Sequence, residues 1–245
     1  MIYSSYLFKG KLLVGDSIHQ FSKGDIYVIG SNLPHIFKSI PGELNAHMVT
    51  VFFTENTFGT DFFKLPYFKD LQSFFYNSNC GFKVLSGEKQ ISDSILKLST
   101  QDKLDRFVSF LQLLEQLSTV AIEPLSKFIY SKTLTSNEGE RLQVIFDYVF
   151  KNFQKPIALE EISKMAFMTP NAFCRFFKQR TNKTFFQFLI ELRVEHACQL
   201  LSSKRELNIN LISDLSGFNS ISNFNKKFKK IKGVTPTKYQ RSIFI

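Results

Sequence analysis

Residues 217–239 read GFNSISNFNKKFKKIKGVTPTKY, and this stretch decides the fold of the C-terminal half. Phe224 and Phe228 stand four residues apart, as on the buried face of an amphipathic helix. Gly217 supplies the sharp turn that two steeply crossing helices need before that helix begins. The pattern therefore predicts a tight turn and a short helix that buries Phe224, Phe228 and Ile231.

The same pattern occurs a second time, 51 residues earlier in the chain. Residues 173–178, FCRFFK, correspond to residues 224–229, FNKKFK. Thr169 and Pro170 suit the N-cap and the first position of the helix in the earlier copy. A shorter apolar stripe precedes each copy and predicts a first helix, so each copy predicts one helix-turn-helix unit.

A continuous helical pattern, residues 184–202, joins the two units. At about 1.5 Å per residue, a helix of this length spans roughly 28 Å. One turn of B-DNA is about 34 Å long. A rigid connecting helix of this length could hold the two second helices in successive major-groove segments on one face of a duplex.

The face of each second helix opposite the phenylalanines is polar and basic. Asn and Arg can read base edges with two hydrogen bonds, and Lys suits bases or phosphates. A generic solvated helix face is the alternative interpretation. The candidate DNA-binding residues are Asn171, Cys174, Arg175 and Lys178 in the first unit and Ser222, Asn223, Asn225, Lys226, Lys229 and Lys230 in the second.

Positive charge is concentrated in the same half of the chain. Residues 1–137 carry 13 Lys/Arg and 12 Asp/Glu, a net charge of +1, whereas residues 138–245 carry 18 and 9, a net charge of +9. A basic domain joined to a neutral one suggests a polyanionic partner, although a basic surface can also serve only solubility. The polar stretch 131–140 predicts a linker, with the domain boundary between 137 and 138.

Residues 1–85 predict mostly strands, and helices follow. Short β-branched and aromatic runs separated by turn residues favour a sandwich or barrel. Residues 91–130 change to the three- and four-residue spacing of helices. Their stripe from Leu104 to Leu117 either packs on its own barrel or contacts a second copy of the chain. The predicted class is α+β: a barrel with a helical linker and dimerisation region, then an all-α domain.

Residues 141–241 resemble the AraC/XylS family of bacterial transcriptional regulators. The resemblance is strongest at 159–162, 173–178, 191–201 and 217–239. It implies a regulator that binds double-stranded DNA site-specifically through tandem helix-turn-helix units, with RNA polymerase as a further partner. It also implies an effector or dimerisation domain, and hence a homodimer. Lys226 stands where Arg is common, and Lys lacks the planar fork of Arg.

The N-terminal half is similar to the cupin-type sensor domains of such regulators. Gly24-Asp25 followed by Pro34-His35 resembles the second cupin motif, whereas the first motif has no match, so the expected barrel is truncated. His35 could be a structural histidine, a pocket residue for a small-molecule effector, or a metal ligand. We expect no metal and no cofactor, because His19, His35 and His47 lack the spacing of metal ligands.

Other features argue against membrane, secreted and catalytic roles. No stretch of about 18 apolar residues and no signal-peptide pattern occurs. The three cysteines are widely scattered, which argues against a disulfide framework and favours a reducing cytoplasm. The family resemblance implies that this is the cytoplasm of a bacterium, with the protein at the nucleoid. No metal triad or acid–base pair is found, so no catalytic residue is expected. The alternatives are a cupin-type enzyme with a DNA-binding tail and an effector-independent architectural protein.

Overall fold

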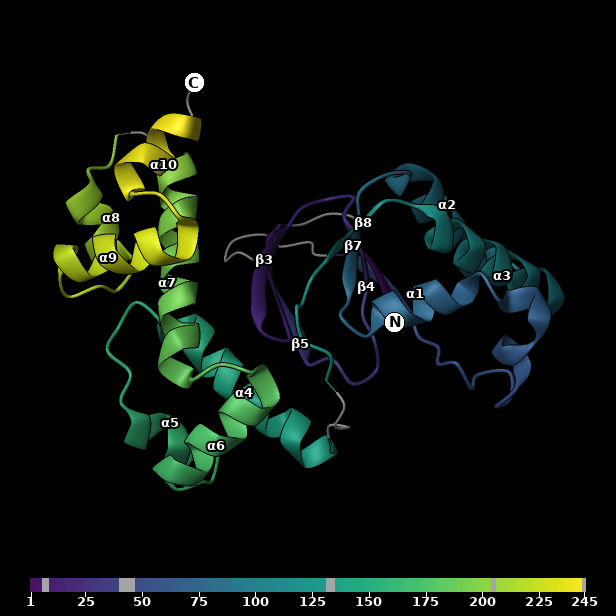
Figure 1. Cartoon of the computed structure of the whole chain (residues 1–245), viewed down its shortest axis with the longest axis horizontal. Coiled ribbons are helices and arrows are strands. Elements are labelled where there is room, and N and C mark those ends of the chain that lie inside the picture. The colour runs from purple at the N-terminus through teal and green to yellow at the C-terminus, as the bar shows by residue number, and fades with distance from the viewer. Residues whose placement is uncertain (6–8, 40–46, 131–134, 204–205, 244–245) are drawn as a thin grey trace. The chain divides into compact units, whose positions relative to one another are not determined.

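The computed structural model describes residues 1–245 except 6–8, 40–46, 131–134, 204–205 and 244–245 (Figure 1). The chain divides into two compact units, residues 1–134 and 135–245. The first unit contains sheets and helices, and the described part of the second contains helices. The α+β prediction is therefore confirmed.

The first unit is built on two antiparallel sheets. One sheet has the strand order β6-β1-β4-β7-β8 and the other has the order β3-β2-β5. The strands are β1 (Ile2–Ser5), β2 (Gly10–Val14), β3 (Ser17–Phe21), β4 (Ile26–Val28), β5 (His35–Ser39), β6 (Met48–Val51), β7 (Phe82–Val84) and β8 (Ile122–Pro124). The helices are α1 (Leu71–Ser78), α2 (Glu88–Thr100) and α3 (Lys103–Thr119), with 3-10 helices at Phe62–Lys64 and Pro66–Phe68.

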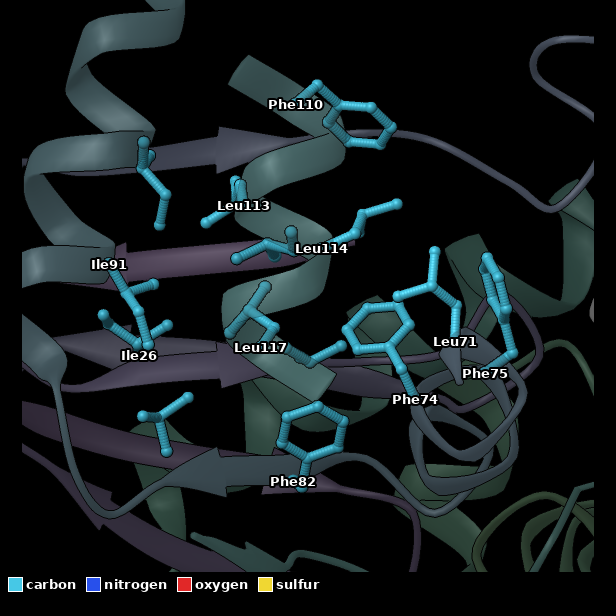
Figure 2. Packing of buried hydrophobic residues seen from close by; sticks show 14 of the residues in the cluster. Ile26, Leu71, Phe74, Phe75, Phe82, Ile91, Phe110, Leu113, Leu114 and Leu117 are labelled. Carbon is cyan, nitrogen blue, oxygen red and sulfur yellow. The ribbon is translucent and has the colours of Figure 1, made fainter. Parts of the chain in front are cut away.

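Strand alternation sorts the side chains of the five-stranded sheet onto two faces. Ile2 and Ile26 lie in a core that the sheet shares with the three α-helices. Their sequence neighbours, Tyr3 and Tyr27, lie in a second core that the sheet shares with β2 and β3. Figure 2 shows the first core, in which the apolar side chains of α3 point toward the strands. The unit is therefore layered as helices, five-stranded sheet and three-stranded sheet.

The structure corrects the prediction for this half in two respects. The strands form two separate sheets and not a closed barrel. Helix α1 lies inside the region predicted to be mostly strands; Leu71, Phe74 and Phe75 have helical spacing and are buried on one face. At the other end, the predicted helical region closes with strand β8, because Ile122 pairs with Val84 of β7.

The second unit is helical and Phe-rich in its core. Its helices are α4 (Ser136–Asn152), α5 (Leu159–Met165), α6 (Pro170–Thr181), α7 (Phe185–Ser203), α8 (Ile209–Leu215), α9 (Ile221–Lys232) and α10 (Pro236–Ile243). The Phe146, Phe177 and Phe188 rings of α4, α6 and α7 pack with centroids 5.5–6.1 Å apart. The Phe224 and Phe228 rings of α9 pack 5.6 Å apart in the core that α7, α8 and α9 share.

The polar stretch predicted as a linker instead starts a helix. The Thr135 hydroxyl accepts a hydrogen bond from the Glu138 backbone N–H at 3.3 Å, and the Glu138 carboxylate accepts one from the Thr135 N–H at 3.0 Å. This reciprocal capping box fixes the first turn of α4. The division between the two compact units lies between residues 134 and 135, three residues before the predicted boundary at 137/138. Residues 131–134 of the stretch lie outside the described residues.

Candidate nucleic-acid interface

Two helix pairs, α5–α6 and α8–α9, are joined by the same turn. In the first turn, the backbone N–H of Phe167 donates to Lys164 O at 2.9 Å, and the N–H of Met168 donates to Ser163 O at 2.9 Å. In the second turn, Gly217 donates to Asp214 O at 2.9 Å and Phe218 donates to Ser213 O at 3.1 Å. Phe167 and Gly217 both have positive φ, 55° and 84°. The repeat in the sequence is therefore a repeat in backbone conformation.

A hydroxyl group caps the second helix of each pair. The Thr169 hydroxyl accepts a hydrogen bond from the Ala172 N–H at 3.3 Å, at the start of α6. The Ser220 hydroxyl accepts one from the Asn223 N–H at 3.4 Å, at the start of α9. Pro170 is the first residue of α6, as the sequence predicted. The other N–H groups of each first turn remain available to a phosphate.

One face of each second helix is anchored by phenylalanine. Phe173 and Phe177 of α6 are fully buried, and so are Phe224 and Phe228 of α9. Ile231 was predicted to join them, but it is 36% exposed. Ile231 lies in the last turn of α9, beyond Phe228, and there the Tyr239 ring of α10 covers Phe228 at 5.5 Å instead.

The opposite face of each second helix is exposed. All ten predicted DNA-binding side chains are exposed. Neither helix contains an acidic residue. Among the described residues, no ion pair or side-chain hydrogen bond occupies the basic groups of this face, Arg175, Lys178, Lys226, Lys229 and Lys230. These cations are therefore free to meet an anionic partner, while their individual contacts with DNA remain a prediction.

Sequence reasoning missed one residue of this face, Gln179. Gln179 is exposed on α6 and stands 51 residues before Lys230, which is exposed on α9. Gln can hydrogen-bond adenine with both ends of its amide. The repeat offset that paired the other residues could have identified Gln179 from the sequence.

Other cations of this half are committed to structural ion pairs. Lys183, just after α6, pairs with Glu191 of α7, and Lys232 at the end of α9 pairs with Glu195 of α7. Each pair ties the end of a second helix to the connecting helix. Arg180 of α6 is buried and its Nε donates to Glu138 of α4 at 3.2 Å. The hydrogen bond from Arg180 is the main reason why the pKa of Glu138 is held below its ordinary value.

The segment after α4 ties the two helix-turn-helix units together. Arg193 in the middle of α7 donates from Nε to Phe153 O at 2.7 Å and from a terminal nitrogen to Lys155 O at 2.8 Å. Gln154 donates from Nε2 to Leu215 O, at the end of α8, at 2.8 Å. Any Cβ on Gly217 would lie 2.8 Å from the Gln154 backbone. We call Phe153, Gln154, Lys155 and Arg193 the brace.

His35 of the first unit has protein partners on both ring nitrogens. Its Nε2 lies 2.6 Å from the Tyr3 hydroxyl, and its Nδ1 lies 2.9 Å from Leu33 O. Burial lowers the pKa of His35, which favours the neutral ring. Within the described part of the chain, no cluster of three His, Cys, Asp or Glu side chains could hold a metal ion. A role for His35 in effector binding remains a prediction.

The comparison with protein families points to this same half. Residues 162–242 match a family model described as a helix-turn-helix domain. The chain is 32% identical over 103 residues to a probable transcriptional regulator LumQ of Photobacterium leiognathi, covering 41% of each protein. It is 23% identical over 182 residues to the uncharacterized HTH-type transcriptional regulator YdeC of Bacillus subtilis (strain 168), covering 70% of this chain and 60% of YdeC.

The chain thus spans less than two thirds of the length of these two relatives. Among solved structures, it is similar to the C-terminal domain of AraT, a response regulator from Geobacillus stearothermophilus. The identity is 29%, the TM-score is 0.39, and the match covers 45% of this chain and 88% of the other. A search of the described helices for one long and apolar enough to cross a membrane finds none.

Proposed function

We propose that residues 162–242, which match a model described as a helix-turn-helix domain, form a DNA-binding domain of the AraC type, and that the protein regulates transcription by binding specific DNA sites. The observation that carries the proposal is the repeated pair of exposed, acid-free faces on α6 and α9. Each face is presented by a helix whose other side is anchored by buried phenylalanine. A duplex would therefore meet two similar basic surfaces, one on each side of the connecting helix α7 (Phe185–Ser203).

The proposed binding mode places α6 and α9 in successive major-groove segments. Helix α7 has 19 residues, Phe185–Ser203, and spans roughly 28 Å at about 1.5 Å per residue. That length is close to the repeat of about 34 Å between successive turns of B-DNA. The brace and the ion pairs on α7 support a fixed separation of the two helices.

Side chains of the two faces divide into base readers and phosphate binders. Asn171 and Arg175 in the first unit, and Asn225 and Lys226 in the second, are the proposed base readers. Lys230 lies off the centre of this face and is the proposed phosphate contact, because a flexible ammonium group suits a phosphate. Lys178 and Lys229 occupy equivalent positions one turn further along each helix.

The N-terminal unit, residues 1–134, supplies regulation and self-association in this proposal. Leu114 of the predicted α3 stripe is fully buried in the core of its own unit, whereas Leu104 is 72% exposed and Val108 is 47% exposed. The exposed end of the stripe is the proposed contact with a second copy, and Leu104→Glu should weaken it. A small-molecule effector and RNA polymerase are the further proposed partners, on the chromosome of a bacterial cell.

A binding titration tests the proposal. Fluorescence anisotropy of a labelled duplex pool, measured with the full chain at two salt concentrations, should show tight binding that weakens steeply with salt through counterion release. The double variant Arg175→Ala/Lys226→Ala should lose most of the affinity, while Lys97→Ala, an exposed lysine of α2, should retain it. A salt-independent affinity, or equal losses in the two variants, would refute the proposal.

A further inference from the structure

A pocket in the N-terminal unit, residues 1–134, has a largely apolar lining in which phenylalanine is the commonest residue. It lies between strand β6 and the helices α2 and α3, and its volume is about 410 Å³. Strand β6 is the edge strand of the five-stranded sheet, so the pocket lies beside the sheet and not within it. Small-molecule sites in proteins have volumes of about 300–1,000 Å³, so this pocket is large enough for a small ligand.

The apolar wall is a packed aromatic cluster with one exposed side. The Phe58 ring lies 4.9 Å from Phe107 and 5.8 Å from Phe110, and Phe110 lies 4.9 Å from Phe53. Phe52, also in the lining, is 70% exposed, and Phe58 is 40% exposed. Covering this exposed aromatic surface with an apolar group removes it from water, which is favourable.

Two cations complete the lining, and both belong to the first turn of α3. Lys103 and Arg106 line the pocket, whereas the nearby carboxylates Asp102 and Asp105 do not. Arg106 donates one hydrogen bond to Gln101 O at 2.6 Å, which fixes its side chain and leaves its other N–H groups unassigned. Lys103 has no ion pair or side-chain hydrogen bond with any described residue. The pocket therefore joins an apolar cage to a positively charged rim.

We infer that this pocket binds an amphipathic monocarboxylate, with its apolar body in the phenylalanine cage and its carboxylate at Lys103 and Arg106. One negative charge suits a rim with two exposed cations and a lining that is otherwise mostly apolar. The inference rests on the proposed function in one respect, because the carboxylate would then be the effector of the regulator. The pocket is distinct from His35, which belongs to the other face of the five-stranded sheet.

Calorimetric titration of the full chain with 3-phenylpropionate tests the site, and 3-phenylpropan-1-ol serves as the uncharged control. The acid should bind about tenfold more tightly than the alcohol, as expected for two exposed ion pairs. Lys103→Gln/Arg106→Gln should abolish that difference, whereas Lys97→Gln on α2 should preserve it. Phe58→Ala should weaken the acid and the alcohol alike, and a thermal melt confirms that each variant is folded.

Anisotropy of a DNA complex, with and without saturating acid, tests the effector role. The acid should change DNA affinity about fivefold or more in the wild type, and not in the Lys103→Gln/Arg106→Gln variant. Absent binding, equal binding of acid and alcohol, or an unchanged DNA affinity with acid bound would overturn the inference. DNA binding that persists in any of these cases leaves the proposed function intact, whereas a wild type that fails to bind DNA contradicts the proposed function itself.

Discussion

The two helix-turn-helix units make the same turn with different residues. At the left-handed position, the first unit has Phe167 and the second has Gly217. Phe167 adopts an unfavourable positive φ, and its side chain, which is 87% exposed, gains little packing that would offset this cost. Gly217 is buried against the Gln154 backbone, where a Cβ would lie 2.8 Å away. The first turn is therefore open and has room for a side chain at this position. The second turn is closed, because the backbone of Gln154 in the brace leaves no room for a Cβ.

The units also differ in how their second helices are tied down. Arg180 of α6 is buried and bonded to Glu138 of α4, whereas the residue 51 positions later in α9 is the exposed Ile231. The first unit thus depends on a polar tie that the second lacks. The repeated sequence preserves the exposed basic face of each second helix, while the supports behind that face differ.

Removing the aromatic anchor should have the largest effect, and it should be similar in the two units. Phe177→Ala and Phe228→Ala each delete a fully buried ring, and each should lower the free energy of unfolding by about 3–5 kcal/mol. Urea denaturation followed by circular dichroism measures this loss. A cost below about 1 kcal/mol for either variant would show that the unit does not rest on that core.

Alanine at the left-handed position should affect the stability of the two turns differently. Gly217→Ala combines positive φ with a 2.8 Å contact to backbone, and it should lower stability by roughly 2 kcal/mol or more. Phe167→Ala keeps a Cβ in an open turn and should change stability by less than about 0.5 kcal/mol. Equal shifts of the melting temperature in these two variants would contradict the contrast between open and closed turns.

Breaking the brace should uncouple the units. Arg193→Met removes two hydrogen bonds from a cation to the Phe153 and Lys155 carbonyls, and should cost about 1.5–3 kcal/mol of stability. The affinity for DNA containing two half-sites at the native spacing should then fall, and the affinity for DNA with altered spacing should fall less. If anisotropy with a spacing series shows an unchanged optimum and an unchanged affinity, the brace does not set the separation.

Gln179 of α6 and Lys230 of α9 occupy equivalent positions, so substituting each one compares the two exposed faces. Lys230→Ala should weaken specific and random DNA alike and lower the slope of log affinity against log salt by about one. Gln179→Ala removes no charge and should leave that slope unchanged. Titrations at several salt concentrations distinguish these outcomes, and a slope that is insensitive to Lys230 would exclude its contact with phosphate.

Acid should weaken the contact between α4 and α6 through Glu138. Its pKa is lowered in the folded chain, chiefly by Arg180, so its stabilising contribution is present above the ordinary value of 4.5 and is lost as pH falls through the folded pKa. Glu138→Gln should be less stable near neutral pH and should lose stability less steeply below about pH 4.5. Thermal melts across this range should converge for the two proteins, and parallel curves would exclude this ionisation.

The helical half was predictable because its signals are local. The spacing of Phe173 and Phe177, the N-cap at Thr169 and the offset of 51 residues all lie within short windows, and the structure bears out both helix pairs. The brace was not predictable, because Gln154 and Leu215 lie 61 residues apart in the sequence. Only the folded backbone brings that side chain and that carbonyl together.

The N-terminal half was harder because its sheets depend on distant pairing. Ile2 of β1 pairs with Val28 and with Val51, and β8 joins the sheet from residues beyond two helices. Short strands of three to five residues give little periodicity of their own. The spacing of the short strands favoured a sandwich or barrel and the cupin resemblance favoured a barrel, but the structure has two separate sheets.

Selection of tight-binding duplexes from a random pool tests most directly whether α6 and α9 each read their own segment of DNA. We expect the wild type to select two conserved blocks about one helical turn, roughly 10 base pairs, apart. Arg175→Ala should relax one block only, and Lys226→Ala should relax the other, with a smaller effect because Lys lacks the fork of Arg. A single conserved block, or two blocks that neither substitution changes in folded protein, would contradict reading by both helices.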